Sequence, residues 1–179
     1  MNNNFYLLSA MKNFILLFLF LSAVPPIFGQ DFAPSESLLI TGKVKKEKVF
    51  TLSDIKKNRT ILLGEINTSC SPKQKVNAKG VKAILVRDLL DSVKFDYASS
   101  KALNQFYFKF EASDGYAIVY SFNEIYNTET GKNLYIVTEK DGIDIAQMDN
   151  RILILTTSDI KSGSRNIKNL SRIVVCKAE

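Results

Sequence analysis

The most constraining feature of the chain is a stretch near its middle in which apolar and polar side chains alternate. Between Gln105 and Ala112 every second residue is apolar, beginning with Phe106. This period of two predicts a half-buried β-strand, because successive side chains of a strand point to opposite faces of the sheet. An Asp114-Gly115 pair and a second β-rich run up to Tyr120 follow. An Asp-Gly pair between two such runs predicts a β-hairpin.

Short strands and short helices are predicted along the rest of the chain. Apolar or β-branched runs predict strands at 38–44, 49–52, 60–66, 133–138, 151–156 and 171–176. Residues 86–93 place apolar side chains on one helical face, Ser53-Asp54 is expected to cap a short turn, and Ser121 to Glu124 fit a capping box. Residues 67–79 are polar and predict a loop. The chain is therefore expected to be an α+β domain with many strands and two or three short helices.

An uncharged apolar run, Phe14–Val24, dominates the N-terminus; Lys12 precedes it and Pro25-Pro26 follows. Its length matches the core of a signal peptide, ~7–15 residues, and falls short of the ~20 residues of a membrane-spanning helix. We expect residues 1–29 to be a signal peptide, 30–37 a polar tail and 38–179 the domain. The mature protein is then periplasmic or secreted, without a membrane span. An uncleaved anchor or a buried core helix is the alternative.

Composition excludes several classes of site. The chain has no histidine, which removes Ser-His-Asp and Cys-His hydrolases and His-ligated zinc or haem sites from this chain. The formal net charge is +6, but the lysines are scattered among acids, so we expect a solvated basic surface and no nucleic-acid partner. Cys70 and Cys176 are the two cysteines. In an oxidising compartment they either form a disulfide or stay unpaired.

The order of the motifs between Leu38 and Val175 resembles the oxidoreductase molybdopterin-binding domain of the sulfite-oxidase type. The motifs that carry the resemblance are Thr41–Val44, Phe50–Ile55, Ala83–Leu90, Ser113–Tyr116, Glu124, Asp141-Gly142, Arg151–Thr157 and the tail from Arg165 through Asn169–Ile173. The sequence departs from the family at Ala83, where glycine is usual, and at Thr156-Thr157, which replace a proline and a glycine. The resemblance implies a sulfite-oxidase-type fold of mixed sheets, which in full-length members holds a molybdenum-pterin cofactor.

The resemblance also implies a set of site residues. Members that hold molybdenum present a cysteine thiolate just beyond a strand, and Cys70 follows the predicted strand at 60–66, although its neighbours lack the usual Gly-Asn. A thiolate suits the metal, and a pterin phosphate is bound by Arg or Lys donors. Cys70 is therefore the candidate metal ligand, and Arg151, Lys161 and Arg165 are candidate cofactor contacts. The alternative is a structural Cys70 and three surface charges.

Three functions remain open at this point. The first is an exported molybdopterin-binding-like domain that binds a pterin or an anion with little catalysis of its own. The second is a small molybdenum-dependent oxidoreductase, or a redox subunit, that needs a partner protein in the envelope. The third is a cofactor-free interaction module of the envelope. The sequence gives neither the substrate nor the oligomeric state, and it leaves open whether the chain is an enzyme.

Overall fold

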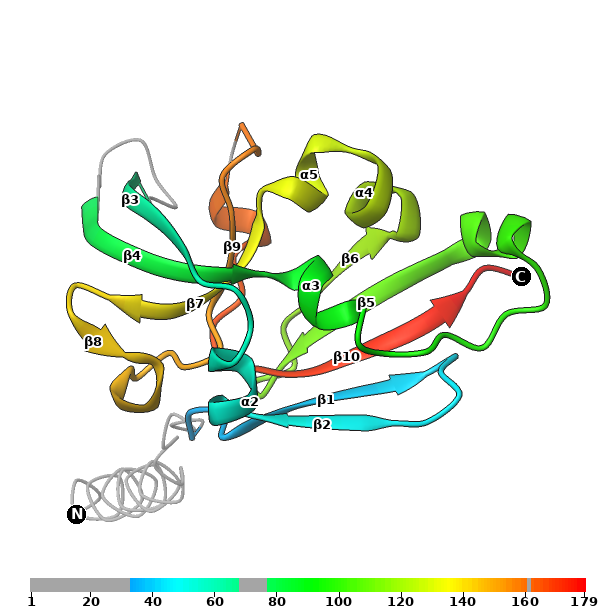
Figure 1. Ribbon diagram of the computed structural model, residues 1–179, viewed down its shortest axis with the longest axis horizontal. Helices are drawn as coiled ribbons and strands as arrows, with labels where there is room; N and C mark the ends of the chain where they lie inside the picture. Colours follow the sequence, from blue (N-terminus) through cyan, green and yellow to red (C-terminus); the bar gives the residue numbers. More distant parts are fainter. Residues whose placement is uncertain (1–32, 68–76, 161) are drawn as a thin grey trace, which may run out of the picture. The chain divides into compact units, whose positions relative to one another are not determined.

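The computed structural model describes residues 33–67, 77–160 and 162–179, which form two sheets and several short helices (Figure 1). The elements are β1 (Ser37–Gly42), β2 (Lys48–Thr51), α2 (Leu52–Lys56), β3 (Ile61–Asn67), β4 (Asn77–Leu85), α3 (Val86–Leu90), η1 (Ser100–Gln105), β5 (Phe106–Ala112), β6 (Ala117–Ser121), α4 (Phe122–Asn127), α5 (Glu129–Lys132), β7 (Leu134–Lys140), β8 (Ile143–Asp144), η2 (Ile145–Gln147), β9 (Ile154–Thr156), η3 (Ser162–Arg165) and β10 (Leu170–Lys177). The predicted α+β class is confirmed. The predicted signal peptide lies outside the described residues.

The first sheet joins strands from both ends of the domain, in the order β2-β1-β10-β5-β6. β1 and β10 are parallel, with Ile40 opposite Ile173, and the other neighbours are antiparallel. The sheet is therefore mixed, as the resemblance implied. The predicted hairpin is confirmed, because β5 pairs with β6 and places Phe110 opposite Ile118. Alternate residues of β5 are buried, beginning with Phe106.

The second sheet has the order β3-β4-β7-β8, and β9 also pairs with β7. β4 is an inner strand that pairs with both β3 and β7. The sequence predicted residues 77–79 as loop, but they are the first residues of β4, so that prediction is wrong there. The reason is tertiary: β3 pairs with this stretch and places Ala78 opposite Ile66. Next to it, the backbone of Lys79 donates to the Asp141 carboxylate at 2.8 Å and accepts from the Asp141 N–H at 3.2 Å.

Capping residues set where two of the helices begin. Ser121 and Glu124 form the predicted capping box at the start of α4. A second capping box joins Thr51 and Asp54 at the start of α2. The predicted cap at Ser53-Asp54 is thus displaced to Thr51, because Asp54 reaches back to the Thr51 N–H and accepts from it at 3.2 Å.

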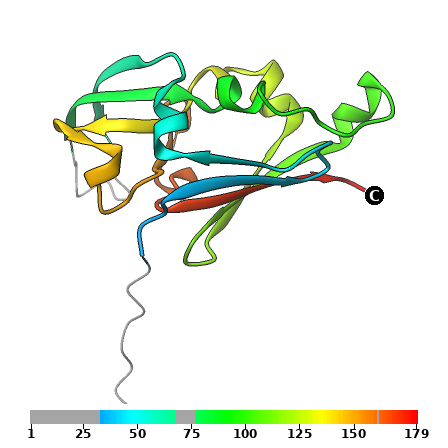
Figure 2. The same ribbon diagram turned by 60° about the horizontal axis from the view of Figure 1, so that its bottom comes forward.

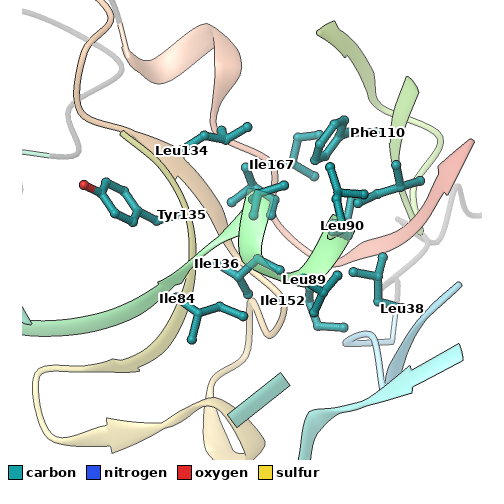
Figure 3. Close-up of a cluster of buried hydrophobic side chains, with 14 of the residues drawn as sticks. Leu38, Ile84, Leu89, Leu90, Phe110, Leu134, Tyr135, Ile136, Ile152 and Ile167 are labelled. Atoms are coloured by element: carbon teal, nitrogen blue, oxygen red, sulfur yellow. The ribbon is translucent and has the colours of Figure 1, made fainter. Parts of the chain in front are cut away.

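The core lies between the two sheets and around α3. Figure 3 shows Leu89 and Leu90 of α3 between Ile84 and Ile136 on one side and Leu38 and Phe110 on the other. These side chains have no exposed surface, so α3 joins the two sheets through apolar contact. Each Å² of apolar surface removed from water stabilises the fold by roughly 25 cal/mol. Figure 2 shows the short helices α3 and α4 on one side of the β1–β10 pair. The 93–97 segment and η1 extend from α3 toward the end of this sheet.

The predicted strand at 151–156 is shorter in the structure. Ile154–Thr156 form β9 and are fully buried, as predicted. Ile152 is buried but has a positive φ of 59°, an uncommon conformation for a β-branched residue. Its carbonyl accepts from the Leu170 N–H at 3.0 Å. The bend at Ile152 therefore lies beside the start of β10 and leads into β9, which pairs with β7.

Candidate functional site: an aromatic hollow beside α3

A hollow with a volume of about 530 Å³ opens between α3, the β1–β2 connection, η1 and α4. Ligand sites in proteins commonly have volumes of ~300–1,000 Å³ and mostly apolar walls with a few polar groups. Aromatic, aliphatic and charged side chains line this hollow: Lys45, Asp91, Val93, Lys94, Phe95, Tyr97, Leu103, Phe122 and Tyr126. Its volume falls within this range, and the hollow is open to solvent with a mixed polar and apolar lining.

Backbone hydrogen bonds hold one wall of the hollow in place. The Lys45 N–H donates to the Lys94 carbonyl at 2.8 Å, and the Asp96 N–H donates to the Lys43 carbonyl at 2.9 Å. Val44 and Phe95 form an isolated antiparallel bridge between these two bonds. The 94–96 segment is therefore fixed to the β1–β2 connection, and Lys45 and Lys94 are held as neighbours.

Aromatic rings form another part of the lining. Phe122 and Tyr126 are four residues apart on α4, so they lie on the same face of the helix. Their rings stack with centroids 4.5 Å apart and planes 23° apart. Phe95 meets both rings edge-on, with centroids 6.4 Å away. Phe108 of β5 packs beneath this group, 5.5 Å from Phe95. Phe95, Phe122 and Tyr126 thus line the hollow as members of a packed aromatic cluster.

The polar groups of the hollow include a tyrosine hydroxyl and a carboxylate. The Tyr126 hydroxyl is buried and interacts with the Asp91 carboxylate, although the geometry is not that of a regular hydrogen bond. Burial raises its pKa, and the neighbouring Asp91 carboxylate raises the pKa further. Asp91 follows α3 directly and is exposed. The hollow therefore combines a buried tyrosine hydroxyl and a carboxylate with the two lysines.

Arg165, a predicted phosphate contact, is held by other residues of the chain. Its guanidinium lies 4.0 Å from the centroid of the Tyr120 ring. Nη1 lies 3.3 Å from the Glu124 carboxylate, and Nε lies 3.2 Å from the Asp159 carboxylate, close enough for an ion pair although the angle is not that of a hydrogen bond. The Arg165 side chain is 28% exposed. Two carboxylates already neutralise the charge that a phosphate would need.

Arg151, the second predicted contact in the described part, has different partners. Its Nη1 donates to the Ala146 carbonyl at 2.9 Å and lies 3.2 Å from the Glu36 carboxylate. The contacts of Arg151 and Arg165 involve no common residue. The structure thus gives the two arginines separate partners and no shared anion.

The remaining predicted site residues, Cys70 and Lys161, lie outside the described residues. Cys176, on β10, is half-buried and carries a free thiol. Across residues 33–67, 77–160 and 162–179, no group of three or more Cys, His, Asp or Glu is placed to hold a metal. In the same ranges, no helix is long and apolar enough to cross a membrane.

A molybdopterin would require a thiolate for the metal and free cations for its phosphate. Of the four predicted residues, the two that are described already form ion pairs with Glu36, Glu124 and Asp159. The described residues by themselves therefore do not fit this cofactor.

Sequence reasoning missed the hollow. The i, i+4 pair Phe122 and Tyr126 directly after the capping box was a usable signal, because an aromatic pair at that spacing forms one surface. Phe95 and Tyr97 gave a weaker signal, as two aromatics in a polar segment between elements. No pattern in the sequence joins them to Lys45, since only the tertiary fold brings the β1–β2 connection to this segment.

Comparison with solved structures supports the fold. The chain is similar to a chain of the sulfane dehydrogenase SoxCD from Paracoccus pantotrophus, with 12% sequence identity and a TM-score of 0.53. The match covers 83% of this chain and 39% of the other, so this chain spans well under half the length of that protein. No family model and no curated protein sequence matches. At this identity the likeness concerns the fold alone: the chain has the α+β architecture of part of that dehydrogenase chain.

Proposed function

We propose that this protein is an exported binding domain that takes a small aromatic or other planar molecule into the hollow beside α3, with little catalysis of its own. The hollow carries this proposal, because it joins a packed aromatic wall to a few charged groups. Export is inferred from the apolar Phe14–Val24 run. It is tested by determining the N-terminal residue of the protein recovered from cells, which is expected to be Gln30.

Binding is favoured over catalysis by the groups that line the hollow. Asp91 is the single carboxylate among the lining residues that the structure describes, and the two cations are lysines. The chain has no histidine to act as a general base. Such a set can orient a ligand, but it lacks the paired acid and base that proton-transfer chemistry commonly uses.

A pterin is the planar ligand that the sequence resemblance predicts, so it is the first probe. The exported protein, purified from cells, is titrated with pterin-6-carboxylate, and binding is followed by the fluorescence of the pterin. Leu103→Phe narrows the hollow, and Val119→Phe places the same ring on an exposed position of β6 as the control. We expect saturable binding that Leu103→Phe weakens and Val119→Phe leaves unchanged. Binding that both variants leave unchanged would place the ligand elsewhere.

A molybdenum-dependent oxidoreductase, or its redox subunit, is the second candidate, and the fold shared with a sulfane dehydrogenase chain favours it. The test is the molybdenum and pterin content of protein from the export compartment, beside a Cys70→Ser variant. Stoichiometric metal and pterin that are lost in the variant would make Cys70 a ligand and would call for a search for a redox partner protein. Protein without either group, and without binding in the titration, would leave a cofactor-free interaction module of the envelope.

A further inference from the structure

The charges that line the hollow beside α3 do not cancel, and this narrows the class of its ligand. Its charged lining residues are two lysines and one aspartate, namely Lys45, Lys94 and Asp91. We propose that the hollow selects planar aromatic ligands that carry one carboxylate, and that the two lysines together supply the attraction. This inference rests on the proposed function, because it names the ligand class of the same site.

Asp91 already has partners within the protein. Its carboxylate interacts with the buried Tyr126 hydroxyl, and Arg87 is near enough for its charge to act on the same hydroxyl. Arg87 and Asp91 are also joined along α3, since the Asp91 N–H donates to the Arg87 carbonyl at 2.9 Å. Asp91 therefore does not depend on a ligand for a donor.

The two lysines differ from Asp91 in this respect. Lys45 and Lys94 are both exposed, and among the residues that the structure describes neither forms an ion pair. The hydrogen bond from the Lys45 N–H to the Lys94 carbonyl, 2.8 Å long, holds them as neighbours although they come from different segments. Neighbouring lysines without a carboxylate partner attract an anionic group.

The two segments that carry these lysines add further positive charge. Residues 43–48 and 91–96 contain five lysines and three acids, which gives a net charge of +2. The acids are Glu47, Asp91 and Asp96. Lys48 brings its charge from β2 to the second segment, because its Nζ donates to the Ser92 hydroxyl at 3.0 Å. The summed charge on this side of the hollow is therefore positive, wherever each single charge lies within it.

The aromatic cluster and the positive charge together define the ligand. Phe95, Phe122 and Tyr126 line the hollow, and a planar ring packs on such a cluster through offset-stacked or edge-to-face contacts. The charged lining residues sum to +1, which one carboxylate neutralises. A neutral ligand of the same shape loses this attraction, and a cationic one is repelled.

Three naphthalene probes of nearly the same shape test the inference by equilibrium titration of the exported protein. 2-Naphthoate is anionic, 2-naphthamide is its neutral counterpart and 2-naphthylmethylamine is cationic. Because the chain has no tryptophan, the naphthalene fluorescence is measured against a low protein background. Charge pairs at exposed positions are weak, so we expect naphthoate to bind about threefold more tightly than naphthamide, and the amine to bind most weakly. High salt is expected to reduce these differences, because it screens exposed charges.

Variants assign the preference to the lysines. The double variant Lys45→Gln/Lys94→Gln is expected to bind naphthoate no more tightly than naphthamide, with an unchanged affinity for naphthamide. Lys140→Gln/Lys168→Gln is the matched control, since it removes the same charge from two lysines that do not line the hollow. The control is expected to keep the preference.

Asp91→Asn gives a test in the opposite direction. The amide keeps an acceptor for the Tyr126 hydroxyl but removes the negative charge from the lining. We expect this variant to bind naphthoate about twofold more tightly and naphthamide as the wild type does. Urea unfolding of each variant checks that it is folded.

Equal affinities for naphthoate and naphthamide, or a Lys45→Gln/Lys94→Gln variant that weakens all three probes alike, would overturn the inference. If the pterin binds in the hollow while the naphthalene probes show no preference for the carboxylate, the proposed function stands and only the charge selection is refuted. If neither the pterin nor any naphthalene binds, both proposals fail together.

Discussion

Replacing Arg165 by methionine tests whether this arginine stabilises the fold or binds an anion. Methionine keeps the apolar stem and removes the charge. The change removes a cation–π contact with Tyr120, worth ~1 kcal/mol, and two partly buried ion pairs, worth ~0.5–1 kcal/mol each. It also leaves the Asp159 carboxylate, which is 15% exposed, without its cation. We expect the free energy of unfolding to decrease by about 2–3 kcal/mol.

The measurement is urea unfolding of the wild type and the Arg165→Met variant. The two free energies are compared with the same value for the dependence of the free energy of unfolding on urea concentration. Arg172→Met is the matched control, because Arg172 also pairs with a glutamate, Glu111, but its side chain is 50% exposed. The control is expected to change the free energy of unfolding by less than ~1 kcal/mol. If Arg165→Met is as mild as the control but abolishes the binding of an anion, then Arg165 is a binding residue and the structural assignment is refuted.

Three further perturbations test the fold and the hollow. Tyr126→Phe removes a buried hydroxyl that interacts with the Asp91 carboxylate, so the free energy of unfolding is expected to decrease by ~1 kcal/mol in urea unfolding, and an increase would show that the hydroxyl has no stabilising partner. The hydrogen bond from Lys57 lowers the pKa of Asp54 to about 2 from 3.8, so the stability it contributes is present above about pH 4 and is lost as the pH falls to about 2. The difference in urea midpoint between wild type and Asp54→Asn is therefore expected to shrink over this window, and a constant difference would contradict the assignment. Gly42→Ala is expected to cost ~3 kcal/mol or more, measured by thermal unfolding, because φ is +93° and a Cβ would lie 2.3 Å from the Val175 carbonyl oxygen; a variant with the wild-type midpoint would refute this reading.

The part of the fold that the sequence predicted correctly depends on neighbours within a few residues. The alternation in β5, the Asp114-Gly115 hairpin and the capping box at Ser121 are all of this kind. The failures have tertiary causes. Residues 77–79 show no strand pattern and become strand because β3 pairs with them and Asp141 bonds to Lys79.

The candidate site was less predictable than the fold. The sequence resemblance directed attention to the arginines at 151 and 165, which have the right charge for a phosphate. The structure gives each of them a carboxylate partner from a distant segment, and a sequence cannot show which charges are already paired. The predicted roles of Cys70 and Lys161 and the signal peptide remain predictions, whereas the structure gives Cys176 a free thiol and no disulfide.

The sequence by itself determined the class of the domain, because strand alternation, turn pairs and helix caps are local and each follows from the stereochemistry of a few consecutive residues. Only the tertiary structure decided which strands became neighbours, since β1 and β10 come from opposite ends of the domain and pair in parallel to bury their apolar faces. The same long-range packing brings Lys45, Asp91, Phe95 and Tyr126 around one hollow. These residues form one site because the fold brings them together in space. Their spacing along the sequence does not indicate that they are neighbours.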